Sequence, residues 1–327
     1  MAGNFSNGTD RHAWLDAVDW RAMEIIGFFF YGIYIALGTF LNLGFLAAIL
    51  TSSEMRSTFR NKMVCGILLG NLSDSAIVMP LYIIVHVLHP LMGRSACILW
   101  DMSNLLAYVQ DFVGNWSVCI AIASLVACTY EWDPSLKMSP LAFKIGRIAL
   151  LLFPWLLPSI YIPAVSYGSV KDNRYYCISH SLRGNVFFKV VDSVVPLVSS
   201  AILLCLIAIA RRRRGLAGGV MKTELIGEGS PQQDSVRPYV GVVAIAMVCD
   251  SLFTLLILVY RQITDIRASI ILGFVSHLLR DARVVAIPSG LLLFPDIKDR
   301  VQHWRPWRKQ AAGIDLTINY TRSQDGE

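Results

Sequence analysis

The chain has 327 residues, of which 55% are hydrophobic and only 16% are charged, and its formal net charge is +6. Soluble domains usually carry about a quarter charged residues, so the composition argues against the soluble domains that length alone would allow. The apolar residues fall into blocks long enough to cross a hydrocarbon core of about 30 Å, which takes roughly 20 helical residues. We therefore expect an integral membrane protein, whose basic residues sit beside these blocks and do not indicate a nucleic-acid partner.

Seven apolar blocks follow one another along the chain. They lie at 22–50, 62–88, 96–129, 144–166, 187–210, 238–260 and 268–294. Backbone polar groups in lipid must be satisfied within the segment, so each block predicts a transmembrane helix. The predicted fold class is all-α, a seven-transmembrane helix bundle over 22–294. Residues 295–309 carry basic and apolar side chains at helical spacing, which predicts a short amphipathic helix on the membrane surface, and 310–327 form a tail.

Lys and Arg in the connections predict the orientation. The loops on one side hold twice as many of these residues as the loops on the other side, including the run Arg211–Arg214. The richer side is expected to be cytoplasmic, so residues 1–21 form an extracellular tail and the C-terminus lies in the cytoplasm. This tail contains glycosylation acceptors at Asn4 and Asn7, which agrees with an exposed position at the plasma membrane. It lacks the pattern of a cleavable signal peptide.

The seven cysteines divide by position. Five lie within the apolar blocks, where small packing residues are the simplest interpretation: Cys65, Cys119, Cys128, Cys205 and Cys249. Cys97 and Cys177 lie on the predicted exoplasmic side, which is oxidising. The sequence therefore predicts a Cys97–Cys177 disulfide that ties the loop after the fourth helix to the start of the third.

Several short motifs lie within or beside the blocks at characteristic places. Residues 38–42 read Gly-Thr-Phe-Leu-Asn, residues 92–97 read Met-Gly-Arg-Ser-Ala-Cys, and residues 294–296 read Phe-Pro-Asp. Further matches are Trp155, Pro158, Pro196 and Pro288. Over about residues 25–305 this pattern resembles the rhodopsin-like (class A) G-protein-coupled receptors. The resemblance implies a ligand pocket inside the bundle and a heterotrimeric G protein as the cytoplasmic partner.

The chain also departs from that family at the residues that switch its receptors. The middle of the second helix has Asn71 where the family has Asp, with Asp74 one turn away. The inner end of the third helix reads Thr-Tyr-Glu-Trp-Asp at 129–133, without the family's Arg. The sixth-helix motif reads Cys-Asp-Ser-Leu-Phe at 249–253, and the seventh-helix motif Ile-Pro-Ser-Gly-Leu at 287–291. Coupling to a G protein is therefore left open.

Ionisable residues in the middle of a membrane are costly unless paired or hydrated, and they mark candidate functional sites. Here they are Asp74, Asp101, Asp111, Asp192, Asp250, His277, Arg280, Asp281 and Arg283. Asp101 and Asp192 lie near helix ends, where water can reach them. By the resemblance, Asn71, Asp111 and Arg283 fall near the sodium cavity of related receptors. We hypothesise that the Arg283 guanidinium replaces the ion.

In this hypothesis Arg283 pairs with Asp111 or Asp74 and locks the second, third and seventh helices together. The predicted internal polar lock comprises Asn42, Asn71, Asp74, Asp111 and Arg283. An alternative of equal weight is that Arg283 binds helix carbonyls and water.

A ligand pocket is predicted in the outer half of the bundle. It comprises Asn104, Tyr108, Asp250, Phe253, His277, Arg280 and Asp281. An Arg in such a pocket suits an anionic ligand or a peptide C-terminus. The alternative is that Arg280 and Asp250 only neutralise each other.

Other functional classes are less favoured. A retinal protein needs a Lys inside the seventh helix, and every Lys is predicted to lie at or outside a helix end. An amine receptor would carry Asp where Asn104 falls. His86 and His89 lack a third zinc ligand, so no enzyme, cofactor or metal site is expected. No internal repeat supports a transporter.

The expected function is a G-protein-coupled cell-surface receptor for a small molecule or peptide, in contact with membrane lipids. The alternative is a receptor-shaped protein that does not couple and acts as a scavenger, chaperone or adhesion partner.

Overall fold

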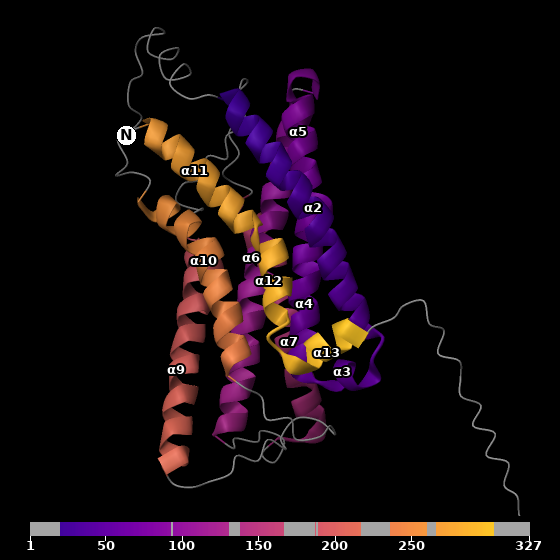
Figure 1. Ribbon diagram of the computed structural model, residues 1–327, viewed down its shortest axis with the longest axis vertical. Helices are drawn as coiled ribbons and strands as arrows, with labels where there is room; N and C mark the ends of the chain where they lie inside the picture. The colour runs from indigo at the N-terminus through magenta and orange to yellow at the C-terminus, as the bar shows by residue number, and fades with distance from the viewer. Residues whose placement is uncertain are drawn as a thin grey trace, which may run out of the picture.

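The computed structural model describes residues 20–92, 94–130, 138–166, 187, 189–216, 236–259 and 266–303. All elements in these ranges are helices, which confirms the all-α prediction for this part of the chain (Figure 1). They are α2 (Trp20–Leu50), α3 (Ser53–Ser57), α4 (Phe59–Ser73), η1 (Asp74–Val78), α5 (Met79–Met92), α6 (Arg94–Thr129), α7 (Pro140–Ser166), η3 (Val190–Val194), α9 (Val195–Leu216), α10 (Arg237–Val259), α11 (Ile266–Asp281), α12 (Arg283–Leu291) and α13 (Pro295–His303).

Six helical spans are long and apolar enough to cross a membrane, which indicates a multi-pass membrane protein. They are Ala22–Leu50, Phe59–Val85, Leu105–Thr129, Pro140–Ile160, Val190–Arg213 and Arg237–Leu256. The last predicted block is not a single helix of this kind, because α11 ends at Asp281 and α12 begins at Arg283. A count of seven is therefore not confirmed. The two helices follow each other along the bundle and pack against α2 and α10 (Figure 1).

Pro288 lies inside α12 and has no N–H to donate to the carbonyl of Val284, four residues earlier. The side-chain nitrogen of Asn42 in α2 donates to that carbonyl at 2.8 Å, and to the carbonyl of Gly38 at 2.7 Å. A helix with a proline is tolerated in a membrane where a neighbour satisfies the freed group. Asn42 therefore joins α2 to α12 at the proline.

The second and fifth apolar blocks each contain a π-helical turn, η1 and η3. Such turns are rare and are frequent at functional sites. Asp74 opens η1 and Asp192 lies in the middle of η3, and both side chains are buried. Each π-helical turn thus holds a carboxylate inside the bundle.

The helix α6 is central, with contacts to α4, α5, α7, α9 and α10. In contrast, α7 packs mainly on α6 and leaves most of its apolar side chains exposed, as expected for a lipid-facing helix. It remains continuous through Pro154, Pro158 and Pro163.

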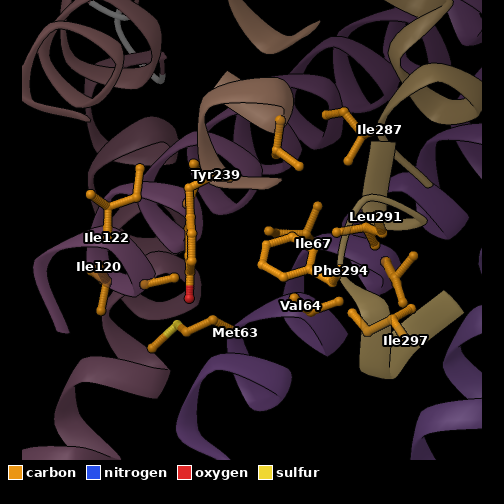
Figure 2. Close-up of a cluster of buried hydrophobic side chains, with 14 of the residues drawn as sticks. Met63, Val64, Ile67, Ile120, Ile122, Tyr239, Ile287, Leu291, Phe294 and Ile297 are labelled. Carbon is orange, nitrogen blue, oxygen red and sulfur yellow. The ribbon is translucent and has the colours of Figure 1, made fainter. Parts of the chain in front are cut away.

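A large apolar cluster fills the end of the bundle next to α13, which we call the α13 end (Figure 2). The rings of Tyr239 and Phe294 meet edge to face, with centroids 5.0 Å apart. The Arg60 guanidinium lies 5.0 Å from the Phe294 ring and forms an ion pair with Asp296. Arg300 donates from Nε to the Ala48 carbonyl at 3.2 Å. The predicted amphipathic helix is thus attached to the ends of α2 and α4.

Some sequence predictions fall outside the described residues. These are the glycosylation sites Asn4 and Asn7, Cys177, the side chains of Cys97, Asp101 and Asn104, and residues 304–327. The Cys97–Cys177 disulfide and the tail boundaries therefore stay predictions.

Candidate functional site

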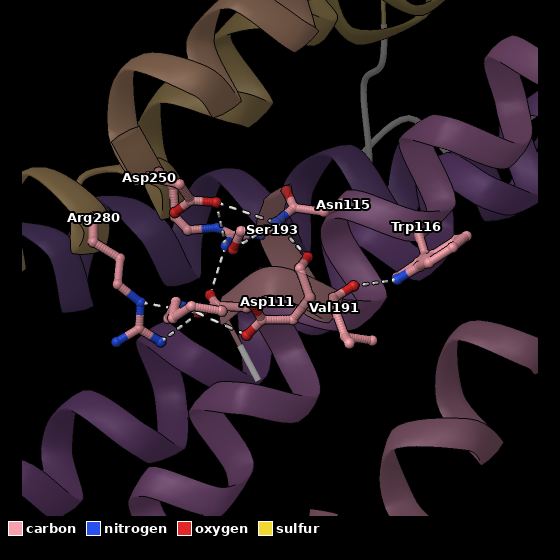
Figure 3. A network of polar contacts seen from close by, with 10 residues as sticks. Asp111, Asn115, Trp116, Val191, Ser193, Asp250 and Arg280 are labelled. Atoms are coloured by element: carbon pink, nitrogen blue, oxygen red, sulfur yellow. Dashed lines mark hydrogen bonds and ion pairs between the residues drawn. The ribbon is translucent and has the colours of Figure 1, made fainter. Parts of the chain in front are cut away.

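The Asp111 carboxylate in α6 is the centre of a buried ionic cluster. Arg283 Nη1 lies 2.6 Å from Asp111 Oδ1, and Lys189 Nζ lies 2.6 Å from Asp111 Oδ2. Arg280 approaches Oδ2 with Nη2 at 3.0 Å and Nε at 3.2 Å. One carboxylate thereby joins α6 to α11, to α12 and to the start of the fifth apolar block (Figure 3).

Lys189 directly precedes η3, near the start of its helical segment, but its side chain points into the bundle and not toward a loop. Its side chain is 1% exposed and lies inside the bundle. The residue stands in the helical segment just before η3, so it does not belong to the loop charges of that side. Its removal from that set makes the difference in basic residues between the two sides larger, in the same direction.

A second layer of polar contacts surrounds the ionic cluster. Asn115 Nδ2 donates to the Asp192 carbonyl at 3.0 Å and to Asp250 Oδ2 at 3.2 Å. Trp116 Nε1 donates to the Val191 carbonyl at 3.0 Å (Figure 3). The π-helical turn η3 displaces these carbonyls from the regular ladder, and side chains of α6 satisfy them. The irregular backbone of η3 is therefore fixed by α6.

Asp192 is not at a hydrated helix end, as the sequence suggested, because its side chain is fully buried. Lys189 Nζ is 3.5 Å from Asp192 Oδ2. Neither carboxylate oxygen accepts a hydrogen bond from the described residues. Buried water commonly satisfies such groups. Asp192 has fewer and longer contacts to the cations of the cluster than Asp111 has.

Phe253 covers the cations of the cluster. Its ring centre lies 5.0 Å from Lys189 Nζ and 5.2 Å from the Arg280 guanidinium. On another side the ring packs against His277, with centroids 4.6 Å apart. Phe253 is buried, whereas His277 is exposed, and the half-buried Tyr108 lies 5.5 Å from Lys189 Nζ. Phe253 therefore separates the cations from the accessible His277.

The remaining predicted residues lie around this centre. Tyr31 lies close enough to Asp281 to interact electrostatically with its carboxylate. Asp74 Oδ1 lies 2.9 Å from the amide nitrogen of Gln110 when that amide is oriented toward it. Asn71 is buried, and its side-chain nitrogen has no hydrogen-bond partner among the described residues.

The partners of Arg283 and Arg280 decide between the alternatives that the sequence left open. Arg283 contacts Asp111 and lies 3.6 Å from Asp250, whereas no ion pair joins it to Asp74 in the described part of the chain. The described contacts of Arg283 are to carboxylates rather than to helix carbonyls. The alternative that Arg280 and Asp250 only neutralise each other is wrong, because Arg280 pairs with Asp111. Arg283 of the predicted polar lock and Arg280 of the predicted ligand pocket thus both contact Asp111.

Gly114 provides the room that the Arg283 guanidinium occupies. A Cβ added to Gly114 would overlap Arg283 Nη2. We expect Gly114→Ala to push Arg283 off Asp111 and to cost about 1–3 kcal/mol of stability, the usual range for overpacking. The matched control is Gly146→Ala, which meets only open space. A lower thermal midpoint is expected for the first variant alone, and equal midpoints would contradict this packing.

Sequence reasoning missed Lys189, Asn115 and Gln110 as members of the site. The available signal for Lys189 was its spacing of three from Asp192, which places both on one helix face. Asn115 and Gln110 are neighbours of Asp111 on α6 at four residues and one residue, and only the first spacing indicates a shared face.

Comparison with known proteins assigns the chain to no family. A scan against protein-family models and a search of the curated proteins each found no match to the chain.

Proposed function

We propose that the chain is a seven-transmembrane cell-surface receptor, with α11 and α12 together forming the seventh crossing. The observation that carries this proposal is the cluster of Asp111 with Lys189, Arg280 and Arg283. Charges buried in a membrane bundle are costly and are retained for function. Ion pairs between helices are also elements whose exchange accompanies switching between two packings. In this proposal the N-terminus is extracellular, and the cluster stabilises the resting state.

The first test of the proposal is the number of crossings. Seven crossings place the two ends of the chain on opposite sides of the membrane, and six place them on the same side. We expect an N-terminal epitope tag to bind antibody on intact cells at the plasma membrane, and a C-terminal tag to bind only after permeabilisation. Asn4→Gln with Asn7→Gln should lower the apparent mass if the N-terminus is glycosylated. Accessibility of both tags on one side would refute the seventh crossing.

The second test concerns coupling to a heterotrimeric G protein. The full chain is expressed with representatives of each class of G-protein α subunit, and ligand-independent dissociation of the heterotrimer is followed by resonance energy transfer. We expect a low basal signal from the wild type and a several-fold higher signal from Arg283→Ala, because that change frees α12 from α6. Gly44→Ala serves as the control, since nothing lies within 4 Å of an added Cβ there.

One specific observation favours a second candidate, a receptor-shaped protein that does not couple. At the end of α6, Thr129 Oγ1 donates to the Leu125 carbonyl at 2.8 Å and Tyr130 donates to the Leu206 carbonyl at 3.5 Å. These residues bond to helix carbonyls and provide no charged switch at the α13 end. Absence of coupling in the wild type and in Arg283→Ala, at surface levels equal to the control, would replace the first candidate by the second.

A further inference from the structure

The buried charges of the described residues do not balance. Apart from Arg60, which pairs with Asp296 at the α13 end, the buried ionisable side chains of the described residues are five carboxylates and three cations. The carboxylates are Asp74, Asp111, Asp192, Asp250 and Asp281, and the cations are Lys189, Arg280 and Arg283. With all eight of these groups ionised, the described residues carry two negative charges in excess, however the cations are shared.

The excess falls on Asp74 and Asp281. Asp111, Asp192 and Asp250 each have a cation within 3.6 Å. No ion pair reaches Asp74 or Asp281 within the described part of the chain. Arg280 attracts both carboxylates, but its one charge is already in contact with Asp111. Asp74 and Asp281 also repel each other.

These two carboxylates also have the largest exposed fractions of the five. Asp74 is 6% exposed and Asp281 is 5% exposed, whereas Asp111, Asp250 and Asp192 are 1%, 2% and 0% exposed. Only one donor approaches the Asp74 carboxylate, the Gln110 amide at Oδ1, so Oδ2 has no partner among the described residues. An unneutralised and slightly accessible pair of carboxylates is a place where a cation can enter.

Three tyrosines lie near Asp281, and one of them, Tyr82, also interacts with Asp74. Tyr31 and Tyr34 of α2 and Tyr82 of α5 lie close enough to Asp281 to interact electrostatically with its carboxylate. All three side chains are partly exposed. Aromatic rings attract organic ammonium groups through their faces, and a strongly hydrated inorganic ion gains less from aromatic neighbours. The surroundings thus favour a cation attached to an apolar body.

We infer that Asp74 and Asp281 bind the protonated amine of a ligand between α2, η1, α5 and α11, close to Tyr31, Tyr34 and Tyr82. The inference deepens the proposed receptor function, on which it rests, by naming the ligand class. The amine supplies positive charge that the cluster lacks. Its binding also competes with Arg280 for the two carboxylates, which couples the ligand to the Asp111 cluster.

The experiment measures the thermal midpoint of the purified full chain in detergent with phenethylammonium chloride as the probe. A ligand that binds only the folded state raises the midpoint with its concentration. We expect a rise of several degrees with the amine and none with 2-phenylethanol, its neutral counterpart, or with sodium chloride at equal ionic strength. Asp281→Asn and Asp74→Asn should each abolish the rise, and Asp299→Asn, an exposed change on α13, should retain it.

Each contrary outcome is distinct. An equal rise with sodium chloride would assign the site to an inorganic cation, and an equal rise with 2-phenylethanol would show nonspecific apolar binding. A rise on acidification without any response to the amine would mean that the carboxylates share a proton. Each of these outcomes overturns the inference. The measurement needs no G protein, so its failure is separate from a failure of the coupling test, and the comparison of probes on the wild type does not depend on the folding of any variant.

Discussion

Asp111→Ala is expected to remove most of the folded protein. The change leaves Lys189, Arg280 and Arg283 buried without the carboxylate that all three contact. Breaking one buried ion pair by removing a single partner costs about 3–5 kcal/mol, which is a large part of the stability of an ordinary domain. The measurement is the thermal midpoint of the full chain in detergent, followed by size-exclusion chromatography with a fluorescent tag.

The matched control is Asp192→Ala, the same change at a carboxylate in the same cluster. Asp192 lies 3.5 Å from Lys189 and accepts no hydrogen bond from the described residues. Lys189 keeps Asp111 as its closer partner in that variant. We expect a clearly smaller loss than for Asp111→Ala. Similar losses for the two variants would show that Asp111 is not the centre of the cluster.

The helical blocks could be predicted from sequence because lipid imposes length and composition on a spanning segment. The predicted block at 96–129 agrees with α6, which begins at Arg94 and ends at Thr129. The block at 268–294 was different, since its middle carries Arg280, Asp281 and Arg283. Hydropathy averages over such a window and does not detect the interruption at Ala282.

The partners within the site could be predicted only in part. The hypothesis that Arg283 pairs with Asp111 came from their expected depth in the bundle, and this contact is present. Lys189 was assigned to a loop because a lysine beside an apolar block usually marks its end. The π-helical turn η3 follows it directly, and nothing in the residue types of 190–194 signals such a turn. The spacing of three between Lys189 and Asp192 was therefore the only sequence signal for the direction of the Lys189 side chain.

Arg280 and Asp250 illustrate the same limit. Both lie at similar depth, so composition and spacing allow them to pair. Rotation of α10 instead turns Asp250 toward Asn115 and Arg283, at 3.2 Å and 3.6 Å. Helix rotation follows from side-chain packing across the whole bundle, which a single sequence does not display.

Arg283→Met is expected to have the second largest effect. Arg283 is the only cation within ion-pair distance of Asp250 among the described residues, whereas Asp111 keeps Lys189 and Arg280 when Arg283 is lost. The change therefore leaves one buried carboxylate without a cation, a loss of several kcal/mol, but smaller than that for Asp111→Ala. The free energy of unfolding, measured by denaturant titration in mixed micelles, gives the value directly.

A double-mutant cycle tests whether the stability lost in Arg283→Met comes from the contact between Arg283 and Asp250. Arg283→Met combined with Asp250→Asn should show a coupling energy of about 0.5–3 kcal/mol, the range for residues in contact. Arg280→Met combined with the same Asp250→Asn is the matched cycle, and we expect it to be close to additive because Arg280 is paired with Asp111. A larger coupling in the Arg280 cycle than in the Arg283 cycle would instead establish the Arg280–Asp250 pairing, and would move Asp250 from the Asp111 cluster to a separate ion pair.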